Sequence, residues 1–240
     1  MTAAAWSLVL AALAGCHTDD YVAYRWDDRR VLCSLSIDDL SSDVHWDDVD
    51  EALAFAAREN AVALLHAHVP GETIRAQTVD DVLSLAAQYG LAFVRHDELS
   101  TFNEPRAGLA LAFDDQATQA WTDMRDVFAS HGARLTFYLT RFHNYTDEMK
   151  AQIAQLAADG HAIEAHTVDH LHANSYVALH GLDAYLDDEV LPSFEILRTA
   201  GYAPSSFAFP FGEARERTYR AVLDLLGVER VRLSLGSCPY

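Results

Sequence analysis

Short apolar segments alternate with longer amphipathic segments along almost the whole chain, and this alternation constrains the fold most. The apolar segments predict strands at residues 31–37, 61–66, 91–95, 108–113, 134–139, 161–165, 206–209 and 228–233. The amphipathic segments predict helices at residues 46–59, 78–89, 116–131, 147–158, 182–200 and 213–226. Regular alternation of this kind predicts a parallel α/β fold, and the number of strands favours a closed barrel.

Length and charge narrow the class of protein further. The chain has 240 residues, half of them hydrophobic, which suits one globular domain with a substantial core. Acidic residues outnumber basic ones by 36 to 17, giving a formal net charge of −19. Such a surface repels phosphate backbones and anionic lipids, so we expect no nucleic-acid partner and no electrostatic docking on a membrane.

The first residues resemble an export signal. Residues 4–14 are almost wholly apolar but too few to span a bilayer comfortably, as in the central region of a signal peptide. They lead into Leu13-Ala14-Gly15-Cys16, which resembles the bacterial lipobox, although no Lys or Arg precedes it. The alternative is a buried N-terminal helix. We predict a lipoprotein signal at 1–15, an exported tether at 16–30 and one domain at 31–240, held at the cell envelope by lipid on Cys16.

Two further cysteines fit this interpretation. If Cys16 carries lipid, Cys33 and Cys238 remain, and an oxidising compartment would permit them to pair. The alternative is two free thiols.

A pair of carboxylates ends the predicted strand at 108–113. Asp114 and Asp115 are adjacent, and adjacent carboxylates repel each other unless a cation or a proton separates them. A metal site would separate them, with one Asp as ligand and the other as base. The alternative is an ordinary acidic turn, because Asp-Asp pairs recur in this chain, for example Asp38-Asp39.

Two histidines follow the predicted strand at 161–165. His166 and His170 are four residues apart, which places them on the same side of a helical turn, where they can chelate one ion. Two imidazoles and one carboxylate suit Zn²⁺ with an open position for water, and would also accept Co²⁺ or Ni²⁺. Surface helices show the same spacing by chance.

A third motif follows the predicted strand at 206–209. Residues 207–212 read FAFPFG, which indicates a rigid turn with an aromatic wall, or alternatively a simple strand-to-helix connection. All three motifs lie at the carboxyl ends of predicted strands, where α/β barrels place their active sites.

Together the three motifs resemble the polysaccharide deacetylase family, the carbohydrate esterases with a NodB-type domain. Residues 113–115 are similar to its Thr-Phe-Asp-Asp motif, 166–170 to its His-Ser/Thr-x-x-His motif, and 207–212 to its Phe-Ala-Tyr-Pro-Phe-Gly motif. The resemblance implies a distorted (β/α) barrel of seven or eight strands that removes N-acetyl groups from an N-acetylated polysaccharide or oligosaccharide. It assigns the divalent metal to Asp115, His166 and His170, the general base to Asp114, and an oxyanion contact to a backbone N–H near Phe211.

The order of the chain departs from that family. A Leu-x-His strand, a helix and a last strand normally close the family's chain, whereas here residues 62–68, 78–89 and 91–94 supply them before the first motif. We predict a circularly permuted barrel, the alternative being an unrelated strand that ends in His. Leu64-Leu65-His66 matches the motif, which makes His66 the expected proton donor, and His68 competes with it because alternate residues of a strand share one face.

One further departure leaves a question open. Ala208 stands where the family's third motif usually carries an Arg that orients the base, so the partner of Asp114 is not identified. Two other functions compete: a metal-dependent amidase with a non-sugar substrate, and an inactive, envelope-anchored glycan-binding domain. We expect a monomer.

Overall fold

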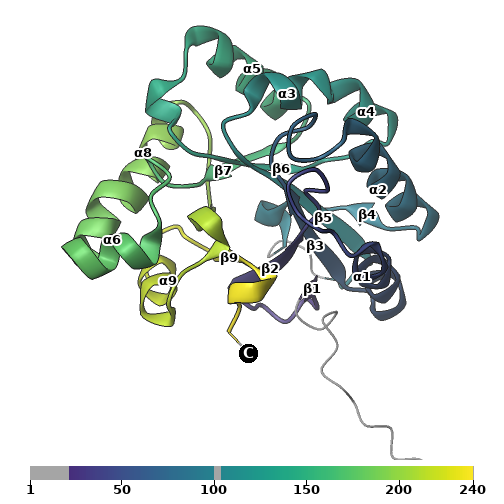
Figure 1. Ribbon diagram of the computed structural model, residues 1–240, viewed down its shortest axis with the longest axis horizontal. Helices are drawn as coiled ribbons and strands as arrows, with labels where there is room; N and C mark the ends of the chain where they lie inside the picture. Colours follow the sequence, from purple (N-terminus) through teal and green to yellow (C-terminus); the bar gives the residue numbers. More distant parts are fainter. Residues whose placement is uncertain (1–21, 100–103, 240) are drawn as a thin grey trace, which may run out of the picture.

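Seven parallel strands close into a barrel in the computed structural model, which describes residues 22–99 and 104–239 (Figure 1). The strands of the ring are β2 (Val31–Ser36), β3 (Val62–Ala67), β5 (Gly108–Asp115), β6 (Thr136–Leu139), β7 (Ala162–Ala165), β8 (Ser206–Ala208) and β9 (Arg230–Ser234). Each strand pairs in parallel with the next, and β3 pairs with β5. This arrangement confirms the predicted α/β barrel.

The ring follows chain order, and β9 completes it by pairing with β2. A ring of this kind has the same strand order wherever the chain begins. The circular permutation therefore stays a prediction.

Helices surround the strands in Figure 1 and bury their apolar faces against them. They are α1 (Trp46–Glu59), α2 (Ala76–Gln88), α3 (Thr118–Asp123), α4 (Arg125–Ser130), α5 (Asp147–Ala158), α6 (Ala173–His180), α7 (Leu182–Tyr185), the π-helical η4 (Leu186–Val190), α8 (Leu191–Thr199) and α9 (Glu216–Leu223). The helix predicted at 116–131 is interrupted at Met124. Helix α6 was not predicted, because its surface lacks a clear apolar stripe and Leu179 is 79% exposed.

Two short strands lie outside the ring. β4 (Ala92–Phe93), one of the predicted strands, pairs with the start of β5. β1 (Ala23–Tyr24) pairs antiparallel with the start of β3, at the end of the barrel opposite the carboxyl ends of its strands. Ala23 and Tyr24 belong to the predicted tether at 16–30, and both are fully buried, so this part of the segment packs on the barrel.

The predicted signal peptide and Cys16 lie outside the described residues. Among the helices that the structure describes, none is long and apolar enough to cross a membrane.

Cys33 and Cys238 form a disulfide in the structure, with their Cα atoms 6.0 Å apart. The bond joins β2 to the segment that follows β9, across 205 residues of sequence. In Figure 1 the yellow C-terminal segment accordingly lies against β2.

Replacing both cysteines by serine is expected to lower the free energy of unfolding by about 2–5 kcal/mol, because a bond that closes so long a loop restricts the unfolded chain. Urea unfolding of the oxidised wild type and of the double variant measures the difference. A reducing agent should lower the midpoint of the wild type alone. Equal midpoints for the two oxidised proteins would show that the bond adds no stability.

Candidate active site

The three predicted metal ligands meet at the carboxyl ends of β5 and β7. Asp115 is the last residue of β5, and His166 directly follows β7. Oδ1 of Asp115 lies 3.5 Å from Nε2 of His166 and 3.1 Å from Nε2 of His170. All three ligand atoms lie within 4.8 Å of one another.

This cluster fits a divalent metal ion. In a tetrahedral zinc site with the usual bond lengths, two ligand atoms lie about 3.3 Å apart. The distances from Oδ1 of Asp115 to the two histidine nitrogens are close to this value. The Nδ1 atom of His166 lies 2.8 Å from the carbonyl oxygen of Ala208, so that Nδ1–H can donate to it and leave the Nε2 lone pair free for a metal. Burial raises the pKa of Asp115, but hydrogen bonds to both histidines outweigh it and lower the pKa below its ordinary value.

The connection between the two histidines is not the helical turn that the sequence predicted. Thr167 and His170 have left-handed backbones, with φ values of 66° and 62°. The N–H of His170 donates to Oγ1 of Thr167 at 3.0 Å. Glu189 of η4 holds this turn from outside: its carboxylate accepts from the N–H of Asp169 at 3.0 Å, and its carbonyl oxygen accepts from Val168 at 3.1 Å. Tertiary contacts thus decide the shape of the turn.

A buried arginine holds the predicted base. Asp114 is 2% exposed, and its Oδ2 accepts a hydrogen bond from Nη2 of Arg232 on β9, which is 1% exposed. The Nη1 group of Arg232 donates to Oγ of Ser34 at 3.2 Å. Among the residues that the structure describes, none hydrogen-bonds the other carboxylate oxygen, Oδ1 of Asp114.

Arg232 resolves the question that Ala208 left open, since it supplies a cation for Asp114 from a different strand. Burial alone would raise the pKa of Asp114, but the positive charge of Arg232 lowers it and helps to keep the pKa below its ordinary value. The sequence contained one signal for this residue. Arg230 and Arg232 alternate within a predicted apolar strand, and an arginine inside a barrel needs a partner.

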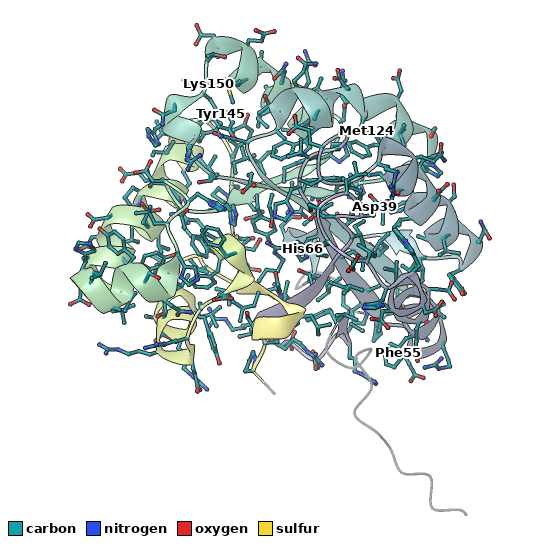
Figure 2. The ribbon with its side chains drawn as sticks, in the orientation of Figure 1. Asp39, Phe55, His66, Met124, Tyr145 and Lys150 are labelled. Carbon is teal, nitrogen blue, oxygen red and sulfur yellow. A yellow bond between two sulfur atoms is a disulfide. The ribbon has the colours of Figure 1, made fainter. Side chains whose placement is uncertain are left out.

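The two candidate proton donors have different surroundings. His66 lies inside the barrel (Figure 2), is 4% exposed, and its Nδ1 atom is 2.8 Å from Oγ of Ser34. Burial and the nearby charge of Arg232 lower the pKa of His66 well below its ordinary value. His68 lies beyond the end of β3, and its Nδ1 atom is 2.5 Å from Oδ2 of Asp38.

Asp38 makes His68 a stronger base. Burial tends to lower the pKa of His68, but the hydrogen bond to Asp38 and the charge of Asp114 raise it to about 9. Asp38 is 3% exposed and also accepts a hydrogen bond from Oγ1 of Thr73 at 2.6 Å. Sequence reasoning missed Asp38 because it counted Asp38-Asp39 among ordinary acidic turns. Its position directly after a predicted strand was the available signal.

Phe211 lies where the third motif predicted an aromatic wall. Its ring is 60% exposed, with its centroid 4.9 Å from the ring of His170 and 5.3 Å from the ring of His172. The turn needs glycine at the next position: Gly212 has a φ of 66°, and a Cβ there would lie 1.9 Å from Oγ of Ser234. The oxyanion contact of a backbone N–H near Phe211 stays a prediction.

The barrel and this arrangement of carboxylates and imidazoles at its carboxyl end are those of a hydrolase. The chain matches the family model described as Polysaccharide deacetylase over residues 103–231, more than half of its length, and it belongs to that family. The family assignment confirms the predicted enzyme class, a polysaccharide N-deacetylase. No curated protein matches the chain significantly.

Solved structures show the same fold at low sequence identity. IcaB from Ammonifex degensii is 17% identical with a TM-score of 0.58, and the match covers 73% of this chain and 86% of IcaB. The deacetylase PplD from Streptococcus pyogenes is 15% identical with a TM-score of 0.56, covering 72% and 91%. A de-N-acetylase from Aggregatibacter actinomycetemcomitans is 14% identical with a TM-score of 0.56, covering 72% and 93%.

Proposed function

We propose that this protein is a metal-dependent hydrolase that removes N-acetyl groups from an N-acetylated glycan of the cell envelope or the extracellular space. The observation that carries the proposal is the pairing of two neighbouring features. Asp115, His166 and His170 converge as a ligand set, and Asp114 beside them is buried, ionised and held by Arg232. We propose Zn²⁺ as the metal, with Co²⁺ or Ni²⁺ as substitutes.

The chain supplies the base for attack on the acetyl carbonyl. A bound divalent metal would lower the pKa of a water molecule and polarise the carbonyl group. Asp114 accepts the proton of the attacking water at Oδ1, while Arg232 fixes Oδ2. The water oxygen forms the new bond to the acetyl carbon, the carbon–nitrogen bond breaks, and acetate and a sugar amine result.

The leaving nitrogen needs a proton, and the contacts favour His68 over His66 as its donor. A donor must be protonated before the reaction, which a pKa of about 9 ensures for His68 at neutral pH. His66 lies two residues before His68, within β3, where its backbone pairs with Ser36 and Ala112. The lowered pKa of His66 leaves its imidazole neutral. We therefore propose His68 as the acid, with Asp38 as the residue that keeps it charged.

Replacing Asp38 by asparagine is expected to move the basic limb of the pH–rate profile to lower pH. In the wild type, kcat/KM should fall as pH rises through about 9, where His68 loses its proton. Asp38 raises that pKa, so its loss lowers the pKa and the decline begins earlier. The matched control is Asp39→Asn, since Asp39 only caps the start of α2 through Arg75 and Thr78. An unshifted limb in Asp38→Asn would exclude His68 as the donor.

Metal content and acetate release together test the proposed function. The purified protein is expected to contain about one equivalent of metal per chain. It should release acetate from oligomers of N-acetylglucosamine, lose this activity on chelation, and regain it with Zn²⁺ or Co²⁺. Metal without acetate release would instead support an amidase with a non-sugar substrate, and failure to bind metal would support a glycan-binding domain.

We propose export and a lipid anchor on Cys16 as the location of the enzyme, with no other membrane contact and a monomeric state. The signal-like start of the sequence supports export, and the Cys33–Cys238 bond suits an oxidising compartment. Mass spectrometry of the mature N-terminus tests the anchor.

A further inference from the structure

A groove of about 590 Å³ begins at Asp115 and His170 and extends away from them. One wall is the loop between β3 and α2, which contributes Val69 and Glu72. The other walls come from the first turns of α3 and α5. Pockets of about 300–1,000 Å³ hold drug-sized ligands. The groove can therefore hold a sugar unit next to the one whose acetyl group is at the metal ligands.

Two carboxylates line this groove from different elements. Glu72 belongs to the loop before α2, and Glu148 to the first turn of α5, and both are exposed. Within residues 22–99 and 104–239 the structure shows no ion pair for either. Arg141 also lines the groove, but its guanidinium donates to the carbonyl oxygen of Asp169 at 3.4 Å. The carboxylates are thus available to a cationic group of a ligand.

The floor of the groove is polar and ordered. Thr140 is 2% exposed, and its Oγ1 has no hydrogen-bond partner among the described residues. Gln152 is 9% exposed and fixed on both sides, because its Oε1 accepts from Thr118 and its Nε2 donates to Gln119, each at 2.6 Å. Among the described residues that line the groove, none is Phe, Tyr or Trp. This surface suits recognition by hydrogen bonds and charge rather than by ring stacking.

We propose that the groove binds a sugar unit with a free amine, adjacent to the N-acetylated unit being hydrolysed. This inference rests on the proposed function and adds the substrate class: a glycan that is already partly deacetylated. An ammonium group would lie between Glu72 and Glu148, and the unpartnered hydroxyl of Thr140 would bond a hydroxyl of the same unit. Because each turnover creates one amine, the enzyme would deacetylate neighbouring units in blocks rather than at random.

Oligomers that differ by one acetyl group test the proposal. The wild type should have a higher kcat/KM for a chitin tetramer with one glucosamine unit than for the fully acetylated tetramer, by about threefold to tenfold, as expected for exposed charge pairs. The preference should shrink at about 0.5 M salt, because salt screens exposed charges. In the double variant Glu72→Gln/Glu148→Gln the ratio should fall to about one. The control Glu195→Gln changes an exposed carboxylate on α8 and should keep the preference.

Product sequences provide a second readout. Partial digestion of a fully acetylated hexamer followed by sequencing mass spectrometry should show adjacent amines with the wild type and scattered amines with the double variant. A preference that survives in the double variant, or scattered amines with the wild type, overturns the proposal. If neither tetramer releases acetate, the proposed function fails instead. Calorimetry with a glucosamine tetramer then still tests the groove. The double variant should bind the tetramer more weakly than the wild type, whereas Glu195→Gln should bind it equally well.

Discussion

Asp114→Asn is expected to abolish turnover while the protein keeps its metal. The amide has the shape of the carboxylate, but it cannot accept the proton of the attacking water. Loss of a general base typically lowers kcat by about 10²–10⁴. The ligands Asp115, His166 and His170 are unchanged, so metal content should match that of the wild type.

The matched comparison is His170→Ala, which removes a ligand and should lose metal along with activity. Metal analysis and acetate release on both variants separate the two roles. Unfolding curves must accompany them, because Asp114 is buried against Arg232. If Asp114→Asn deacetylated as fast as the wild type, another group would be the base.

Arg232→Met is expected to lower the free energy of unfolding by about 3–5 kcal/mol, because it leaves the carboxylate of Asp114 buried without its cation. It should also lower kcat by about 10², since a base displaced by about 1 Å loses its alignment with the water. Urea unfolding and acetate release measure the two effects separately.

Two further variants show how Arg232 acts. In Arg232→Met/Asp114→Asn the unpaired charge is absent, so part of the lost stability should return. Arg232→Lys keeps a positive charge, but lysine has no planar fork to reach both Asp114 and Ser34. Its activity should therefore lie between that of the wild type and that of Arg232→Met. Wild-type stability and activity in Arg232→Met would show that Asp114 is oriented by other groups.

Much of the barrel could be predicted because local pattern and tertiary structure agree in this chain. Helices α1 and α5 have the predicted bounds, and the strands of the ring lie within a residue or two of the predicted segments. The convergence of Asp115, His166 and His170 could be predicted for the same reason, since each motif lies at the end of a strand. Parallel strands bring such positions to one end of the barrel.

The contacts that orient the site residues and shift their pKa values could not be predicted from the sequence pattern. Arg232 lies 118 residues from Asp114 along the chain, and only closure of the ring brings them together. Asp38 and His68 meet because they follow the neighbouring strands β2 and β3, and the sequence alone does not show which strands pair. The turn at His166–His170 depends on Glu189, which belongs to a π-helical segment that no amphipathic pattern identifies.

The seam between β9 and β2 has a consequence for how the enzyme matures. Arg232 is on β9, Ser34 is on β2, and the bond between Cys33 and Cys238 closes the same seam. A growing chain that had not yet released β9 from the ribosome would already carry every metal ligand, but Asp114 would lack its cation. Pairing of β9 with β2 therefore completes the surroundings of Asp114, and we expect full hydrolytic activity only after these two strands have met.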